Sequence, residues 1–448
     1  MEGYLLEDRI AEIVDWFSGF YTSPDGFPYF ELDGDTGTPI GCRTLIAELG
    51  DYLPFLLHCG AESYVDAQLK LFTRRFETTY PLFTRPVTRN IRGVRLALPG
   101  GRSPAYTDIL DYSEILFGLI ECARETGNDA LLTLAHRVFE QVEHLFLKND
   151  RFYSWRLVHL KRRFPLCEPL SGMIIEAAVD LYDSGLGRHY LDVAAAAARV
   201  WIQSPFFTRH RVFPSGMVHR PFIRHLPKFR SVTGRAELCK ANTSMVWALE
   251  ALHRSTGEGE WLEALRNWEA GLRSKFGSEE GGFYQFAALP GHTPIHNPIL
   301  STNFAVLEFY VDMFVATTDQ KMLHHAMLLA DFWLARQSGV TGLFPDESDR
   351  PISYLDGNTD LIIALLKVWE VSGEERYRQS ARRALKGILR FHRCDFGYVR
   401  EVEMNTGNTT NSLIETRFVS LLLKVLLVFA KDWSITGKNG CDSLVRDR

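Results

Sequence analysis

The feature that most constrains this chain is a repeated layout: an amphipathic helix, a loop with glycine and an aromatic residue, then a more apolar helix. The loop cores are PDGFPYF (24–30), NDRFYSW (149–155), HRVFPSG (210–216), EGGFYQF (280–286), VTGLFPDE (340–347) and CDFGYVRE (394–401). The second helices are expected to begin near Arg43, Asp108, Leu170, Asn242, Asn303, Asp360 and Ser412. These intervals of about 60 residues accommodate two helices of about 15–20 residues with their connections.

The two helices of each repeat differ in polarity, as an outer and an inner layer would. TGEGEWLEALRNWEAGLRSKF carries charge on one face, whereas STNFAVLEFYVDMFVAT is apolar nearly all round and must be buried on most sides. We therefore predict an all-α fold, an α/α toroid of six or seven helical hairpins, with residues 1–448 in a single domain. Long site-side loops are expected at about 79–107 and 204–241, because long loops on one face usually build a site. An open solenoid is the alternative, although solenoid repeats are usually shorter, about 34–47 residues.

This layout resembles the six- and seven-hairpin α/α-toroid superfamily, which includes glycoside hydrolases, polysaccharide lyases and sugar 2-epimerases. The resemblance covers essentially the whole chain and rests on the repeated layout, not on a signature motif. It implies a site at the starts of the inner helices and the loops before them. It does not assign a reaction, because one fold hosts many chemistries.

Composition narrows the protein class. The chain has a net charge of −5 and is 46% hydrophobic, which is typical of a globular protein. Its acidic start does not match a secretory signal, and no apolar run reaches the roughly 20 residues of a membrane span. The seven cysteines are scattered without a C-x-x-C pair. We therefore predict a cytoplasmic protein without membrane contact, metal or other cofactor. The acidic loop Glu31, Asp33, Asp35 resembles the start of a calcium loop but lacks the later bidentate glutamate.

Polar residues at the expected inner-helix starts, together with a histidine in the second long loop, supply the candidate catalytic groups. These are Asp108, Asp111, Tyr112, His219, Asp360 and Glu415. Helix capping readily explains Asp108, Asn242 and Asn303. Capping does not explain Glu415 and Arg417, which are expected one to two turns inside an apolar helix. Paired carboxylates, one acid and one base, are the usual groups of inverting glycoside hydrolysis.

Arginine is concentrated in the two long loops, although the protein as a whole is acidic. Five arginines lie between Thr84 and Arg102, and a second basic run lies between Phe206 and Lys240. The guanidinium fork suits carboxylate, sulfate or phosphate, although solvated or salt-bridging loops would give the same pattern. The candidate substrate-binding residues are Arg43, Arg92, Arg95, Arg220, Arg224, Asn242, Asn303 and Arg417. We predict a small-molecule or oligosaccharide substrate that is anionic, such as a uronate, and no nucleic acid partner.

The predicted function is a carbohydrate-active enzyme that uses carboxylate acid/base chemistry, with glycoside hydrolysis as first choice. A uronate lyase or a sugar epimerase on the same fold remains an alternative. A non-catalytic polyanion-binding toroid and an isoprenoid cyclase also remain open, although Asp33-Gly34-Asp35-Thr36 lacks the final aspartate of a D-x-D-D motif. The sequence indicates neither the sugar nor the oligomeric state.

Overall fold

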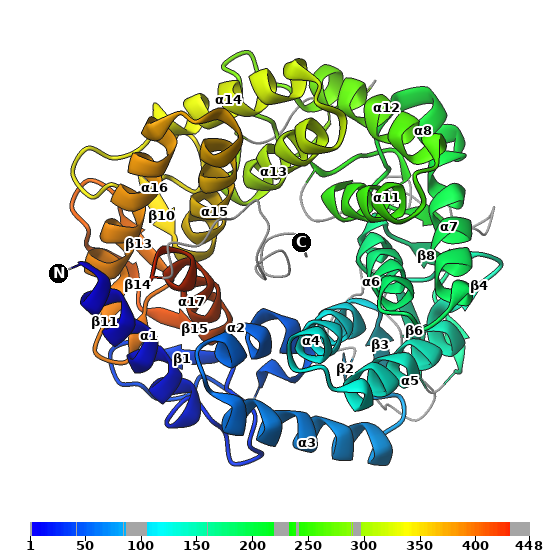
Figure 1. Ribbon diagram of the computed structural model, residues 1–448, viewed down its shortest axis with the longest axis horizontal. Helices are drawn as coiled ribbons and strands as arrows, with labels where there is room; N and C mark the ends of the chain where they lie inside the picture. The colour runs from blue at the N-terminus through cyan, green and yellow to red at the C-terminus, as the bar shows by residue number, and fades with distance from the viewer. Residues whose placement is uncertain are drawn as a thin grey trace. The chain divides into compact units, whose positions relative to one another are not determined.

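A computed structural model describes residues 2–41, 43–83, 85–86, 105–158, 160–218, 233–238, 242–287, 289 and 297–430 (Figure 1). The chain divides into two compact units. Unit 1 comprises Met1–Lys70, Gly277–Gln285 and His296–Arg448, and unit 2 comprises Leu71–Phe276 and Phe286–Ile295. Unit 2 is therefore inserted, in sequence, between the parts of unit 1.

Unit 2 is built from two layers of helices. In one layer α4 (Leu110–Thr126), α6 (Gly172–Asp183) and α11 (Thr243–Thr256) lie side by side, and α5 (Asp129–Phe146), α7 (Arg188–Ile202) and α12 (Gly259–Phe276) pack against them (Figure 1). The short helix α8 (Pro205–His210) follows α7. Helices α6 and α11 approach closely because Gly172 has no side chain: a Cβ there would lie 2.3 Å from the carbonyl oxygen of Ser244. A larger residue at position 172 would push the two helices apart.

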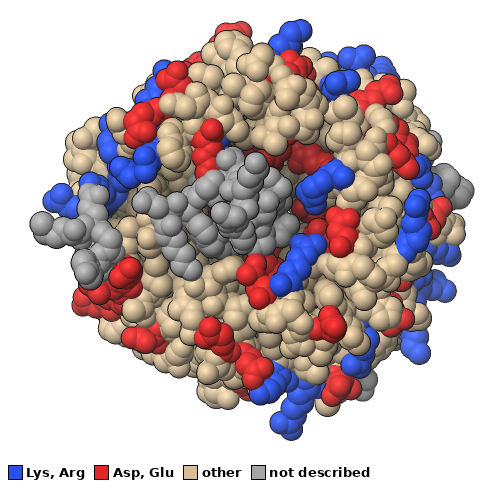
Figure 2. All heavy atoms as spheres, in the orientation of Figure 1, with Lys and Arg blue, Asp and Glu red and all other residues tan. Residues whose placement is uncertain are grey.

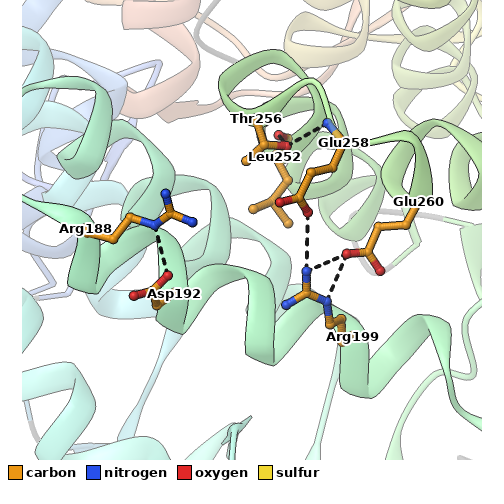
Figure 3. A network of polar contacts seen from close by, with 7 residues as sticks. All are labelled: Arg188, Asp192, Arg199, Leu252, Thr256, Glu258 and Glu260. Atoms are coloured by element: carbon orange, nitrogen blue, oxygen red, sulfur yellow. Dashed lines mark hydrogen bonds and ion pairs between the residues drawn. The ribbon is translucent and has the colours of Figure 1, made fainter.

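Ion pairs join α7 to the turn between α11 and α12 (Figure 3). Arg199 on α7 donates to Glu260 through Nε at 2.9 Å and to Glu258 through Nη2 at 3.3 Å. On α7 itself, Arg188 pairs with Asp192 one turn later at 3.1 Å. These groups are partly exposed, so each pair stabilises the hairpin by less than about 1 kcal/mol. The main effect of the two Arg199 pairs is to fix the position of the turn against α7.

Unit 1 repeats the two-layer arrangement. Helices α13 (Leu300–Thr317), α15 (Leu355–Ser372), α17 (Thr416–Ala430) and the short α2 (Leu53–His58) follow one another in one layer. Helices α14 (Gln320–Leu334), α16 (Glu375–Gly387) and α1 (Glu2–Ser18) form the second layer (Figure 1). The π-helical turn η5 (Ile388–His392) extends α16, and α3 (Glu62–Thr78) begins in unit 1 and ends in unit 2. Most of α13 and α15 is buried, as their all-round apolar sequences predict.

Short antiparallel strands, which the sequence pattern did not predict, carry the segments before several first-layer helices. In unit 1, β1 (Glu31–Asp33) pairs with β15 (Leu413–Glu415). In a second sheet, β13 (Glu401–Glu403) lies between β10 (Ile352–Tyr354) and β14 (Thr409–Asn411). A third pair is formed by β11 (Arg393–Cys394) and β12 (Gly397–Tyr398). In unit 2 the order β2 (Arg85–Pro86), β3 (Ala105–Asp108), β6 (Trp155–Leu157), β7 (Arg162–Arg163) makes one sheet. Two further pairs are β4 (Leu147–Lys148) with β5 (Arg151–Phe152) and β8 (Leu166–Cys167) with β9 (Met217–Val218). Strands β3, β10 and β15 run into α4, α15 and α17, so they fix where those helices begin.

Most predicted helix starts agree with the structure to within three residues, namely those of α4, α6, α11 and α13. Helix α15 begins five residues before Asp360, and α17 begins at Thr416, four residues after the predicted start. The helix predicted near Arg43 is wrong: the 3-10 turns η1 (Leu45–Ala47) and η2 (Leu49–Asp51) precede regular helix at Leu53. A third such turn, η3 (Pro169–Ser171), precedes α6. None of the helices in the described residues is long and apolar enough to cross a membrane.

A recurring asparagine clamp holds the glycine-aromatic loops to the first-layer helices. In each clamp an asparagine side chain binds both the backbone N–H and the carbonyl of a loop phenylalanine. The pairs are Asn242 with Phe213, Asn303 with Phe283, and Asn358 with Phe344. In the second clamp, Oδ1 of Asn303 accepts from the Phe283 nitrogen at 2.8 Å, and Nδ2 donates to its carbonyl at 2.9 Å. The capping role expected of Asn242 and Asn303 is therefore wrong. Their side chains satisfy buried loop backbone that would otherwise lack hydrogen-bond partners.

Candidate functional site

Unit 1 gathers charged side chains where its first-layer helices begin, and we name this group the acid cluster. Its members are Glu48, Asp51, Asp346, Asp356, Glu401 and Glu415, with Arg43, Arg400 and Arg417. They come from η1 and η2, the start of α15, strands β13 and β15, the start of α17 and the loop after α14. Acids outnumber cations, and the group lies where the sequence resemblance placed a site.

Arg400 binds two carboxylates of the acid cluster. Its Nη1 donates to Oε1 of Glu415 at 2.6 Å, and its Nε lies 3.5 Å from Oε1 of Glu401. The Glu415 residue is only 7% exposed, whereas Arg400 is partly exposed. Strand β15 ends at Glu415, so its pairing with β1 fixes the backbone that carries this carboxylate. A buried carboxylate with a charge-assisted hydrogen bond is held in one orientation.

Arg417 and Asp51 form the most buried ion pair of the cluster. The Arg417 Nε lies 2.7 Å from Asp51 Oδ2, and Asp51 is fully buried. The hydroxyl of Ser420, one turn along α17, donates to the Asp51 carbonyl at 2.6 Å. A buried carboxylate requires such a partner, so we interpret the pair as the joint between α17 and η2.

Glu48 is a buried carboxyl with an elevated pKa. Burial raises the pKa of Glu48 to about 7 and Asp51 adds to the rise, although the guanidinium groups of Arg43 and Arg417 oppose it. Arg43 donates to Oε1 of Glu48 at 2.5 Å, while the buried Oε2 has no hydrogen-bond partner among the described residues. The Arg43 side chain is about half exposed, so solvent weakens its hold on the Glu48 charge.

Asp346 is a second carboxyl with an elevated pKa. Burial raises the pKa of Asp346 to about 7, the neighbouring Asp356 and Glu347 raise it further, and Arg400 lowers it. The pKa of Glu415 is also raised, first by burial, and again Asp356 raises it while Arg400 lowers it. Asp346 and Glu415 thus share one acidic and one cationic neighbour. Raised pKa values make both carboxyl groups candidates for acid/base catalysis.

The acid cluster contains three of the residues predicted from sequence, namely Arg43, Glu415 and Arg417. The prediction that Glu415 and Arg417 lie well inside an apolar helix is wrong, because Glu415 ends β15 and Arg417 is the second residue of α17. Asp360 belongs to the same unit and lies in the second turn of α15, half-buried.

Unit 2 holds a separate group of predicted residues at the start of α4. Asp108 ends β3, and its carboxylate accepts from Trp155 Nε1 at 2.9 Å and from the Leu110 nitrogen at 3.2 Å. Tyr112 is fully buried and donates its hydroxyl to Gln141 at 2.9 Å, and burial raises its pKa above the usual range. Asp111 lies beside it in the first turn of α4, 4% exposed. The carboxylate of Asp108 thus serves the local backbone, as the capping interpretation predicted.

Several predicted residues lie outside the described residues. They are Arg92, Arg95, His219, Arg220 and Arg224, which make up most of the basic-loop prediction. Their proposed contact with an anionic substrate therefore stays a prediction.

The acidic loop after β1 forms a tight turn. Oδ1 of Asp33 accepts from the backbone nitrogens of Asp35 at 3.0 Å and Thr36 at 2.9 Å, and bonding to Thr36 lowers its pKa. Across the residues that the structure describes, no three His, Cys, Asp or Glu side chains are grouped to hold a metal ion.

Sequence reasoning missed five members of the acid cluster: Glu48, Asp51, Asp346, Arg400 and Glu401. Asp346 follows the aromatic residue of one repeat loop, VTGLFPDE, and Arg400 and Glu401 end another, CDFGYVRE. Glu48 and Asp51 lie three residues apart, shortly after the predicted substrate-binding residue Arg43. These residues lie in turns, loops and a short strand, whereas the predicted carboxylates come from expected helix starts.

Comparisons with known proteins bear on the fold. No protein-family model matches the chain, and no curated protein matches it in sequence. Solved structures do match over nearly the whole length. An alpha-1,2-mannosidase from Trichoderma reesei aligns with a TM-score of 0.66 and 11% identity over 95% of this chain and 93% of its own. A D-mannose isomerase aligns with a TM-score of 0.61 and 10% identity over 96% and 98%.

A cellobiose 2-epimerase from Bacillus thermoamylovorans aligns with a TM-score of 0.58 and 12% identity over 82% of this chain and 100% of its own. All three are α/α toroids. The chain has the α/α-toroid fold. The fold predicted from the sequence is confirmed, and the toroids it resembles are carbohydrate-active enzymes that include hydrolases, epimerases and an isomerase. At these identities the toroid likeness establishes the fold and leaves the reaction to the residues of the site.

Proposed function

We propose that this protein is a glycoside hydrolase whose acid and base are Asp346 and Glu415. The observation that carries the proposal is their shared environment: both carboxyls have raised pKa values, and Asp356 and Arg400 act on both. The proposal keeps Glu415 from the sequence prediction and replaces Asp108 and Asp111 with Asp346 as the acid. The fold supports it by analogy, because toroids of this kind include an alpha-1,2-mannosidase.

Asp346 is the better proton donor of the two carboxyls with pKa values of about 7. Glu48 is held by Arg43 at 2.5 Å, which favours its charged form, whereas no ion pair is formed by Asp346 among the described side chains. Glu415 is the better base, because the guanidinium of Arg400 at 2.6 Å opposes the rise in its pKa and orients the carboxylate. Asp356 adds negative charge beside both groups, which would stabilise a developing oxocarbenium ion.

The proposed reaction is a single displacement. Asp346 gives its proton to the glycosidic oxygen as the bond from that oxygen to the anomeric carbon breaks. Glu415 takes a proton from the water whose oxygen forms the new bond to that carbon, so the product sugar is inverted. Asp346 ends as a carboxylate and Glu415 as an acid, and exchange with solvent restores both.

The acid cluster favours a neutral sugar ring at the reaction centre. Its three arginines are each bound to carboxylates: Arg43 to Glu48, Arg417 to Asp51 and Arg400 to Glu415. A uronate placed there would meet an excess of negative charge. The predicted anionic character of the substrate therefore depends on the basic loops, and it would belong to a sugar unit away from the bond that is cleaved.

The first test is mass spectrometry of products formed from neutral and uronate-containing oligosaccharides in heavy-oxygen water and in deuterated water. Heavy oxygen in the fragments would support hydrolysis. Unsaturated fragments would favour the lyase alternative, and an intact sugar with deuterium on carbon would favour epimerisation. No change in any substrate would contradict the proposal and favour a binding toroid.

A second test assigns the two carboxyls by leaving group. Asp346→Asn should lose most activity on natural glycosides yet retain activity on glycosyl fluorides, whose leaving group needs no proton. Glu415→Gln should lose activity on both. Asp349→Asn is the matched control, because Asp349 is exposed and lies three residues away in the same loop. Equal losses on both substrates in Asp346→Asn would contradict the assignment of the acid.

A further inference from the structure

Helix α16 exposes a strongly basic face in unit 1. Its sequence ERYRQSARRALKG has five cations and one acid. Tyr377, Ala381 and Ala384 are buried. Arg382 and Arg383 lie on the opposite, exposed side. Helical spacing thus separates an apolar stripe from a basic one.

A groove beside α16 is lined by this basic face. It encloses about 380 Å³, and its lining residues are Leu334, Arg376, Gln379, Arg382, Arg383 and Lys386. No carboxylate belongs to this lining. The volume suits a single small group more than an extended partner surface, because ligand pockets begin at about 300 Å³. We name it the α14–α16 groove.

The cations of the groove differ in how their charge is offset. Arg376 is bound by Asp331 at 3.1 Å and lies 3.9 Å from Glu374. Arg383 instead donates to Oε1 of Gln337 at 2.7 Å, a neutral acceptor. Arg382 forms no ion pair with any described carboxylate. The groove thus contains an oriented guanidinium whose charge is not compensated.

The neutral anchor of Arg383 is itself fixed. Gln337 accepts from the Ser380 hydroxyl at 2.7 Å through the same Oε1. Its amide nitrogen donates to the carbonyl of Gly342 at 2.7 Å and to that of Ser380 at 2.9 Å. The Arg383 guanidinium is therefore held in place without being neutralised, which prepares it to bind an anion.

The simpler explanation is that these cations are only solvated by water. The distribution of charge over the rest of the surface argues against this explanation. Over most of the face in Figure 2, Lys and Arg atoms are interspersed with Asp and Glu atoms. On α7 the cations follow this pattern, since Arg188 pairs with Asp192 and Arg199 with Glu258 and Glu260 (Figure 3). In the α14–α16 groove Arg376 follows this pattern through Asp331, whereas the adjacent Arg382 and Arg383 line the concave surface without an ion pair to any described carboxylate.

We propose that the α14–α16 groove binds a tetrahedral oxyanion, a phosphate or sulfate group, through Arg382, Arg383 and Lys386. Guanidinium groups bind such anions with two parallel hydrogen bonds, and the lysine adds a point charge. The Gln379 amide supplies a further donor at the groove wall. The groove shares no residue with the acid cluster, so this site is independent of the proposed hydrolase activity.

Isothermal titration of the full-length protein with inorganic phosphate, inorganic sulfate and glucose 6-phosphate tests the proposal, with sodium chloride holding the ionic strength constant. We expect saturable binding that weakens by about tenfold or more in Arg382→Gln, since one charge-assisted hydrogen bond is removed. Arg390→Gln is the matched control, because Arg390 is exposed and lies outside the groove. Tighter binding of glucose 6-phosphate than of phosphate would identify a sugar ester as the source of the anion.

Two outcomes would overturn the proposal: binding that does not saturate in the unaltered protein, or equal affinity in Arg382→Gln and Arg390→Gln. Among the described residues the Arg382 side chain has no hydrogen-bond or ion-pair partner, so the variant should keep its melting temperature and remain interpretable. Hydrolysis by Arg382→Gln should equal that of the unaltered protein, which separates this site from the acid cluster.

Discussion

Arg400 donates a hydrogen bond to Glu415 at 2.6 Å, and the same guanidinium lowers the pKa of Asp346. One cation thus acts on both carboxyls of the proposed acid/base pair. Its loss would raise the pKa of each group, because a nearby positive charge favours the carboxylate form.

We therefore expect Arg400→Gln to alter the pH dependence of hydrolysis. A base with a raised pKa stays protonated up to a higher pH, so the acidic limb of the pH–rate profile should shift to higher pH. The rate at pH 5 should fall more than the rate at pH 8. Arg350→Gln is the control, since Arg350 is exposed and pairs only with Glu347 among the described carboxylates. An unchanged profile in Arg400→Gln would contradict the shared-cation account.

Glu48→Gln should stabilise the protein at neutral and higher pH. The pKa of Glu48 is raised from 4.5 to about 7 in the folded state. Its contribution to stability is therefore complete below about pH 4.5 and is lost as the pH rises through 7. Glutamine mimics the protonated form, so the variant should be more stable by up to about 3 kcal/mol at pH 8 and by little near pH 4.5. Denaturant unfolding at the two pH values measures the difference.

Glu403→Gln is the control of opposite sign. Hydrogen bonds from Thr406 and Asn405 lower the pKa of the exposed Glu403. Its contribution is present above the unfolded-state pKa and is lost as the pH falls, so this variant should be less stable than the unaltered protein at pH 8. A destabilised Glu48→Gln at pH 8 would show that its ion pair with Arg43 outweighs burial.

Asn303→Ala should destabilise the protein by about 3 kcal/mol, because both backbone polar groups of Phe283 would lose their buried partner. The free energy of unfolding, measured with denaturant, tests this. Asn405→Ala, at an exposed position, should change it by no more than about 0.5 kcal/mol. A comparably small change in Asn303→Ala would mean that the loop backbone finds other partners.

The buried pair of Lys367 on α15 and Glu308 on α13 should show strong coupling. Their charged atoms lie 2.9 Å apart with side chains 6% and 9% exposed. Lys367→Met alone should cost about 3–5 kcal/mol, since it leaves a buried carboxylate, while Lys367→Met with Glu308→Met should cost much less. A double-mutant cycle in unfolding free energy measures this. Additive losses would show that solvent or Asp312, 3.9 Å from Lys367, already satisfies the pair.

The repeat predicted the fold because each second helix is apolar over most of its surface, as in STNFAVLEFYVDMFVAT, and such a helix needs neighbours on most sides. The sequence did not reveal the short strands, since two or three residues such as Leu413–Glu415 show no periodicity. Without β15, Glu415 was assigned to a helix that in fact begins after it. Because β15 occupies Leu413–Glu415, α17 begins four residues later than the sequence predicted.

The candidate site was predictable only in part, for a different reason. Arg43, Glu415 and Arg417 were identified as polar residues near helix starts. The pKa of Asp346 depends on burial and on Asp356 and Arg400, which lie 10 and 54 residues further along the chain. Nothing in the local sequence PDES distinguishes this aspartate from a solvated loop residue. Its role follows from contacts that exist only after folding.

The pairing of β1 with β15 places Leu32 opposite Ile414, and it therefore joins the earliest part of unit 1 to one of the latest. Glu415 ends that second strand. During synthesis the ribosome must deliver the intervening residues, unit 2 included, before the proposed base can take its position. A nascent chain would accordingly have no activity on sugars until β1 pairs with β15. The onset of activity would therefore mark the completion of folding.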